Sequence, residues 1–198
     1  KTYALDAGSS VWDVSAFDVN NDGKGDIVAL CCDENSEPLK KFVAVYFADA
    51  QGAYSEKPST TVPVDPSLSV FFPVEIDGAA PKELAAASAE GLVAFGYSDG
   101  DLAPVFEAKF MSLFPSGTRE PSFLKDAAQD IDGDGIDEWF VPMPTGFALH
   151  NPKGEVAQIR CDVSSSIRAG SGMYVSNKFP AYHPFAIEGQ KEKAIAFL

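Results

Sequence analysis

The sequence has few histidines, few cysteines and no long apolar run, and each shortage excludes a class of protein. The two histidines, His150 and His183, stand near neither a Gly-x-Ser-x-Gly turn nor a spaced metal motif, so we expect ordinary loop or strand-edge residues. Three cysteines, Cys31, Cys32 and Cys161, are too few for a disulfide framework, and buried free thiols are expected. No apolar stretch approaches the roughly 20 residues of a membrane span.

Basic residues are scarce as well. The chain has 15 Lys and Arg against 29 Asp and Glu, which gives a formal net charge of −14. A field of this sign repels nucleic-acid phosphates and anionic membranes and attracts cations, so neither nucleic acid nor a membrane is an expected partner. The same charge also keeps a secreted protein soluble. With 198 residues, 45% of them hydrophobic, the chain is long and apolar enough for one compact core.

What the sequence does contain is a repeat, made of an acidic turn followed by an apolar strand. Its copies are FDVNNDGKGDIVAL from Phe17, VEIDGAAPKELAAA from Val74, QDIDGDGIDEWFV from Gln129 and, faintly, FAIEGQKEKAIAF from Phe185. The first acids of the three clear copies, Asp18, Glu75 and Asp130, lie 57 and 55 residues apart. This period is too long for most helical repeats and suits a four-stranded blade.

Each repeat unit is predicted to contain four strands. Helical periodicity is nearly absent, and the runs IVAL, FVAVYF and LVAF are short, rich in β-branched and aromatic residues, and bounded by turn formers. Residues 82–91 (KELAAASAEG) have a helix-forming composition, but in register they align with strands of the other copies, so we predict a strand. A glycine turn at Gly52, Gly100 or Gly154 precedes the last strand of each unit.

We therefore predict an all-β fold: a β-propeller of four-stranded blades of about 56 residues, with about three and a half blades present. The single domain 1–198 divides into units at 11–64, 65–115, 120–162 and 170–198, with 1–10 as a possible closing strand. Such propellers commonly close with about seven blades. The chain is thus expected to belong to a larger propeller, to be completed by a second chain, or to close as a four-bladed ring through residues 2–7.

Side-chain oxygens occur at positions 1, 3, 5 and 9 of the first and third acidic turns, with a backbone carbonyl at position 7. The predicted ligands are Asp18, Asn20, Asp22, the Lys24 carbonyl and Asp26, and then Asp130, Asp132, Asp134, the Ile136 carbonyl and Glu138. Calcium takes about six to eight such hard oxygens, and without a cation these carboxylates would repel one another. We predict two calcium sites. The alternative is that Asp, Asn and Gly only form turns here.

The second acidic turn is predicted to bind no metal, and the EF-hand is excluded as an interpretation of the first and third turns. The second turn, Glu75–Glu83, keeps acids at three positions but has Ala79 in the centre, so we expect it to be metal-free. An EF-hand needs a bidentate acid at position 12 and flanking helices. That position holds Ala29 in the first copy and Val141 in the third, both within apolar strand runs, so the EF-hand interpretation fails.

The motif D-x-[DN]-x-D-G-x-x-[DE], followed by a hydrophobic strand and a turn such as YFADAQGAY (46–54), resembles the FG-GAP/VCBS repeat family, which is related to the integrin α-subunit propeller. The resemblance covers about 17–198 and is specific for the first and third copies. It implies a β-propeller with calcium in its blade loops, in secreted or cell-surface proteins that bind proteins or glycans. It also implies the ligand residues given above, although Glu138 replaces the usual Asp.

The expected function is a calcium-binding, secreted, cell-surface or periplasmic module for protein or carbohydrate binding and adhesion, with no catalytic residues. Weak calcium affinity of roughly 10⁻⁴–10⁻³ M suits extracellular calcium. Two alternatives stay open: the non-catalytic propeller part of an extracellular enzyme of the polysaccharide lyase or phospholipase type, or a structural subunit of a surface assembly. Core positions are expected for Trp12 and Trp139. The candidate ligand-binding loops are 33–41, 63–73 and 164–173.

Overall fold

The computed structural model describes residues 2–118, 120–144, 146–160, 182–186 and 193–197. Within these residues the chain forms fifteen strands and no helix, which confirms the all-β prediction. In the same described part, accordingly, no helix has the length and apolar character needed to cross a bilayer.

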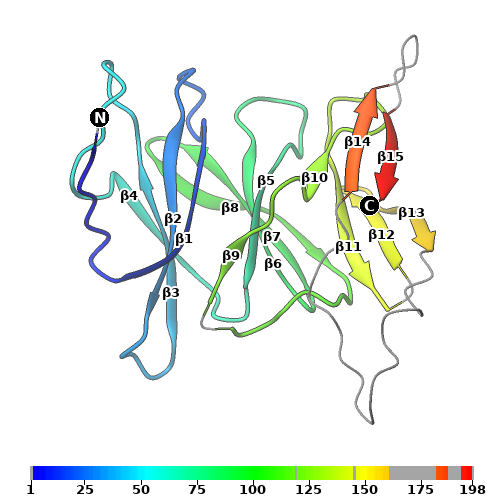
Figure 1. Ribbon diagram of the computed structural model, residues 1–198, viewed down its shortest axis with the longest axis horizontal. Helices are drawn as coiled ribbons and strands as arrows, with labels where there is room; N and C mark the ends of the chain where they lie inside the picture. Colours follow the sequence, from blue (N-terminus) through cyan, green and yellow to red (C-terminus); the bar gives the residue numbers. More distant parts are fainter. Residues whose placement is uncertain (1, 119, 145, 161–181, 187–192, 198) are drawn as a thin grey trace.

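Three sheets and one isolated strand pair make up the fold (Figure 1). The first sheet contains β1 (Ser10–Phe17), β2 (Asp26–Asp33), β3 (Lys40–Tyr46) and β4 (Thr60–Val64). The second contains β5 (Val70–Val74), β6 (Glu83–Ser88), β7 (Gly91–Ser98), β8 (Asp101–Lys109) and β9 (Ser122–Phe123). The third contains β10 (Ala128–Gln129), β11 (Glu138–Met143), β12 (Gly146–Asn151) and β13 (Gly154–Arg160). Strands β14 (Tyr182–Ala186) and β15 (Lys193–Phe197) pair with each other.

Four consecutive strands of each sheet form an antiparallel meander that begins with the predicted repeat. An acidic turn joins the first strand to the second in all three sheets, and the last residue before the turn pairs with the ninth residue of the turn. These pairs are Phe17 with Asp26, Val74 with Glu83 and Gln129 with Glu138. The three copies of the sequence repeat therefore also share the same strand pairing around the turn.

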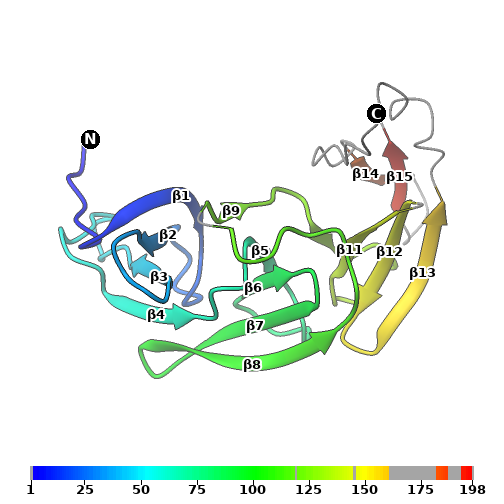
Figure 2. The ribbon, with the colours of Figure 1, turned by 90° about the horizontal axis from the view of Figure 1, so that it is seen from below.

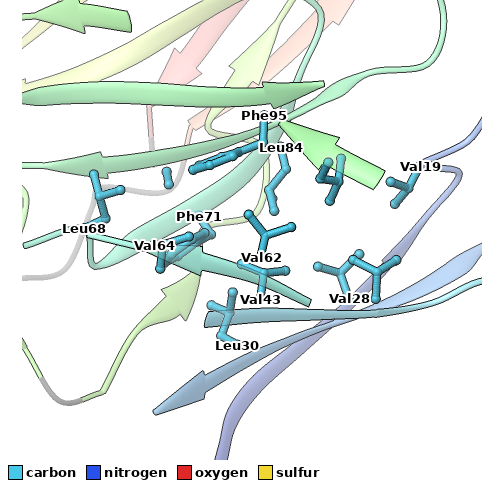
Figure 3. Packing of buried hydrophobic residues seen from close by; sticks show 13 residues of the cluster. Val19, Val28, Leu30, Val43, Val62, Val64, Leu68, Phe71, Leu84 and Phe95 are labelled. Atoms are coloured by element: carbon cyan, nitrogen blue, oxygen red, sulfur yellow. The ribbon is translucent and has the colours of Figure 1, made fainter. Parts of the chain in front are cut away.

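The sheets pack face to face, with the second sheet in the middle (Figure 2). Side chains along the middle sheet alternate between its two faces, as the pleat of a strand requires. Phe71 and Leu84 pack against the first sheet, whereas Phe72 and Ala85 pack against the third. Figure 3 shows the first of these interfaces, where Val28, Leu30, Val43 and Val62 lie opposite Phe71, Leu84 and Phe95.

Burial on both faces explains why the alanine-rich segment is a strand. Ala85, Ala86 and Ala87 are all fully buried, with Ala86 facing the first sheet and the other two facing the third. Alanine favours helix in isolation, but tertiary contacts on both sides of the sheet outweigh that weak preference. The predicted strand within 82–91 is confirmed as β6 and the start of β7.

Residues 2–9 lie against the outer face of the first sheet and form no strand. Leu5 and Ala7 cover the buried side chains of Cys31 and Tyr46, and the Asp6 N–H donates a hydrogen bond of 2.8 Å to the Glu56 carbonyl. The N-terminal segment thus shields from solvent a face of the first sheet that no neighbouring sheet covers in the described part of the chain.

The pairing of β9 and the bounds of the segment between β4 and β5 were not predicted. Strand β9 pairs in parallel with β5, although the sequence unit 120–162 would place it with the third sheet. The Phe123 N–H donates a hydrogen bond of 2.8 Å to Asp13 of β1, which links β9 to the first sheet. In addition, the predicted loop 63–73 is wrong at both ends, because β4 extends to Val64 and β5 begins at Val70.

The two tryptophans have opposite environments. Trp139 is fully buried between the second and third sheets, which confirms the predicted core position. Trp12 is 38% exposed, so the same prediction is wrong there. Trp12 lies in the edge strand β1, in which Val11 and Val14 are also exposed and in which the register against β2 shifts between Val11 and Asp13.

Cys31 and Cys32 are both buried thiols outside any disulfide, as predicted. Burial, together with the neighbouring Cys32, raises the pKa of the Cys31 thiol to about 11, which suppresses the reactive thiolate. Cys161 lies outside the described residues.

Candidate metal-binding turns

The three acidic turns share one hydrogen-bonding pattern. In each, the carboxylate at position 9 accepts a hydrogen bond from the backbone N–H at position 2. The N···O distances are 3.0 Å from Val19 to Asp26, 3.1 Å from Ile76 to Glu83 and 3.0 Å from Ile131 to Glu138. This bond ties the entry of each turn to the first residue of the following strand.

The carboxylate at position 1 organises the inside of the turn. Asp130 accepts hydrogen bonds from the N–H groups of Gly133 (2.7 Å) and Gly135 (3.2 Å), and Asp18 accepts one of 2.8 Å from Gly23. All three glycines have φ between +80° and +91°, a left-handed conformation that side chains rarely adopt. Glycine adopts this conformation without strain, and Asn21, with φ +60°, takes it in the first turn at the position that Gly133 occupies in the third.

The third turn brings three predicted ligands together. One carboxylate oxygen from each of Asp130, Asp132 and Glu138 lies within 4.8 Å of the others, and no second group of three such residues is as compact in the described part of the chain. Asp134 is outside this group, and its Oδ1 accepts the Ile136 N–H at 2.8 Å. The structure thus assembles three of the four predicted side-chain ligands in this turn.

Glu138 is the most constrained member of the group. Its residue is 3% exposed, and no described donor meets hydrogen-bond geometry at its buried Oε1 atom, although the Asn151 amide lies near enough to the carboxyl to influence its pKa. Burial raises the pKa of this carboxyl, and the charges of Asp132 and Asp134 add to the effect, while the Ile131 N–H and the Asn151 amide oppose it. A cation bound by the group would supply the missing partner and offset the repulsion, so this donor set fits a hard metal ion.

The first turn contains the same residue types but leaves fewer oxygens free. Asp26 is fully buried, and its two oxygens accept the N–H groups of Val19 at 3.0 Å and of Ala48 at 2.9 Å. The Lys24 ammonium lies 3.1 Å from Asp22 Oδ2 and lowers the pKa of that carboxyl. Hydrogen bonds and an ion pair within the chain therefore already engage two of the acids that were predicted to bind calcium.

The second turn is linked to the third through a residue that the sequence did not single out. Asp137 Oδ2 accepts hydrogen bonds from the Glu75 N–H at 2.9 Å and from the Lys82 ammonium at 2.6 Å. Asp137 is nearly fully buried, so this ion pair is better shielded from water than a surface pair. The only sequence signal was an extra acid at position 8 of the third turn.

A pocket of about 500 Å³ lies where the first and second turns approach β10 of the third sheet. Phe17, Pro73 and Pro81 supply apolar walls, and Asp18 and Lys82 supply charge. The volume falls within the range of small-molecule sites. Because Asp18 borders this space, the first turn is open to solvent on one side.

His150 is a packing residue in the interior strand of a sheet, so the predicted loop or strand-edge position is wrong. It lies in β12 between β11 and β13, with its ring 5.2 Å from that of Phe110 and stacked at 6.5 Å on Trp139. Burial lowers the pKa of His150, which favours the neutral ring. His183 lies in β14, a strand in which only the backbone is described.

Comparisons of the chain with protein-family models, with curated proteins and with solved structures found no match. The case for a site therefore depends on the geometry of the turns themselves.

Proposed function

We propose that the chain is a calcium-binding β-propeller module in which each four-stranded antiparallel meander is one blade. Three observations support this: the sheets are meanders of similar length, they stack face to face, and each has an acidic turn at the same place (Figure 2). In this proposal β1, β5 and β10 are the inner strands and β14 with β15 begins a further blade. Another part of a longer chain, or a second chain, completes the ring.

The observation that carries the calcium proposal is the unpartnered, buried Glu138 oxygen beside Asp130 and Asp132. Asp134 and the Ile136 carbonyl complete the ligand set predicted for this turn. Calcium would cross-link β10 to β11 and neutralise the repulsion among the acids.

We propose a second, weaker calcium site in the first turn, held by Asp18, Asn20, Asp22, Asp26 and the Lys24 carbonyl. Binding there has a cost that the third turn does not have. Calcium must displace the Lys24 ammonium from Asp22, and the Asp26 oxygens keep their backbone hydrogen bonds. We expect the first turn to fill at higher calcium concentration than the third.

The proposed role is non-enzymatic binding of a protein or glycan outside the cytoplasm, with calcium as a structural ion. Consecutive antiparallel strands reverse direction, so the acidic turns lie on one rim of the stack and the connections 34–39 and 65–69 lie on the other. A pocket of about 370 Å³ on this opposite rim is lined mainly by polar residues, among them Ser9, Asp33 and Asn35. This pocket supports the predicted loop 33–41 as part of the ligand surface.

Calcium titrated into the chelator-treated chain is expected to give a binding isotherm with a Kd of roughly 10⁻⁴–10⁻³ M, the range of extracellular calcium modules. Isothermal titration calorimetry measures it directly. Magnesium serves as the control and is expected to bind more weakly, because it demands a tight octahedron that a flexible acidic turn does not provide. The absence of a calcium isotherm would overturn the proposal.

A further inference from the structure

Three buried side-chain atoms in the described residues have no hydrogen-bond partner, and all lie on the strand pair β10 and β11. They are Gln129 Oε1, Glu138 Oε1 and Trp139 Nε1. The indole of Trp139 faces the second sheet. The other two atoms are oxygens at the third acidic turn. Both are acceptors, so neither can satisfy the other, and an unpaired buried polar group destabilises the folded chain.

The two oxygens belong to residues that face each other. Gln129 and Glu138 are directly opposed in the antiparallel pair β10–β11, which Figure 1 shows side by side. Opposed residues project to the same face of a sheet, with Cβ atoms about 4.5–5.5 Å apart. Gln129 also directly precedes Asp130, the first ligand of the turn. The side chain of Gln129 therefore projects to the same face of the strand pair as that of Glu138, at the entry of the turn.

The other two turns provide an internal comparison. The residue that corresponds to Gln129 is Phe17 in the first turn and Val74 in the second, each paired with the acid at position 9. Neither can offer an oxygen. In the first turn, moreover, the Ala48 N–H satisfies the second oxygen of Asp26. Only the third turn combines an unsatisfied position 9 with an amide oxygen across from it.

We propose that Gln129 Oε1 is an additional ligand of the cation in the third turn, outside the nine-residue pattern. This inference rests on the proposed calcium site. Side-chain amide oxygens are ordinary calcium ligands, and a larger set of oxygens favours calcium, with six to eight ligands, over the smaller magnesium ion. Gln129 then makes the third turn the tighter and more calcium-selective of the two proposed sites.

A competing arrangement is that the Gln129 amide rotates and donates its N–H to Glu138 Oε1, because the two ends of an amide are assigned from their surroundings. The two arrangements differ in how they respond to a carboxylate. If Gln129 is a ligand, Gln129→Glu keeps an oxygen for calcium. If Gln129 is a donor, the same substitution places two carboxylates against each other with nothing between them.

The test uses terbium as a luminescent substitute for calcium, in the full chain with Asp18→Asn and Asp22→Asn, so that the first turn loses two of its three acids and the third turn keeps its full ligand set. Lifetimes in H₂O and D₂O count the water molecules on the bound ion, and competition by calcium gives its affinity. We expect Gln129→Leu to add one bound water and to weaken calcium about tenfold. We expect Gln129→Glu to bind calcium at least as tightly as Gln129 does.

The outcomes separate this inference from the proposal on which it rests. An unchanged water count and affinity in Gln129→Leu, or loss of binding in Gln129→Glu, overturns the role of Gln129 while the calcium site stands. A parent chain that binds neither terbium nor calcium overturns the site itself. Thermal melts in EDTA check that each variant is folded, and Asp77→Asn in the second turn is the matched control, with no expected change.

Discussion

Calcium at about 100 times its Kd is expected to raise the melting temperature of the chain by about 5–10 °C, and most of the rise is expected to disappear in Glu138→Gln. Ligand at that concentration adds about 2.7 kcal/mol to the free energy of unfolding, and each kcal/mol shifts the melting temperature of a chain of this size by about 2–4 °C. Glutamine is isosteric and still accepts the Ile131 N–H, but it removes the charge that calcium requires. Differential scanning calorimetry in calcium and in EDTA measures both quantities.

The same variant is expected to melt no lower than the wild type in EDTA. Without metal, Glu138 is a buried carboxylate near two other acids, and the amide removes their repulsion. Glu83→Gln is the matched control, since it changes the same position in the turn that lacks a central acid, and it should leave the calcium response intact. A full calcium response in Glu138→Gln would contradict the assignment of this residue as a ligand.

Phe71→Ala and Phe72→Ala are each expected to lower the free energy of unfolding by about 3–5 kcal/mol. The two rings are adjacent in β5 and point to opposite faces, Phe71 toward the first sheet and Phe72 toward the third. Both are fully buried, so each truncation leaves a cavity in a different interface. Denaturant unfolding followed by circular dichroism measures the two losses.

Equal costs at these neighbours are the signature of a sheet that is packed on both faces. Val105→Ala is the control, because this β8 side chain is 59% exposed and its truncation should cost less than about 0.5 kcal/mol. If only one of the two phenylalanines were sensitive, one face of the middle sheet would be open to solvent. That result would contradict the stacked arrangement and, with it, the basis for counting the sheets as blades.

Periodicity explains why the strands could be predicted. The acidic turns recur at nearly constant spacing, and the strand after each turn holds alternating or continuous apolar residues, so register alone predicted β6 against the helical preference of its alanines. These signals are local in sequence and are repeated, which makes each copy a check on the others.

Features that depend on distant residues could not be predicted in this way. The pairing of β9 with β5 joins segments about 50 residues apart and leaves no periodic trace in a two-residue strand. Trp12 is a residue type that is usually buried, but it lies with the exposed Val11 and Val14 on the edge strand β1. Such outcomes depend on which neighbour covers a strand, and a single sequence does not contain that information.

The candidate site, too, was predicted only in its local features. The acids of the first and third turns were identified from spacing, yet their different surroundings were not. Ala48, which satisfies Asp26, lies 22 residues away from it. The unpartnered oxygen of Glu138 becomes visible only when the turn is folded beside β10. The sequence therefore predicted two equivalent calcium turns, and the structure distinguishes them.

The most direct test of calcium binding at the third turn is amide hydrogen–deuterium exchange, with and without calcium, read by mass spectrometry. One experiment compares peptides that cover 18–26, 75–83 and 130–138, so the three turns serve as controls for one another. We expect calcium to slow exchange at 130–138 and to leave 75–83 unchanged, because only the former gains a cross-link between its strands. Exchange at 130–138 that is the same in calcium and in EDTA would contradict the account.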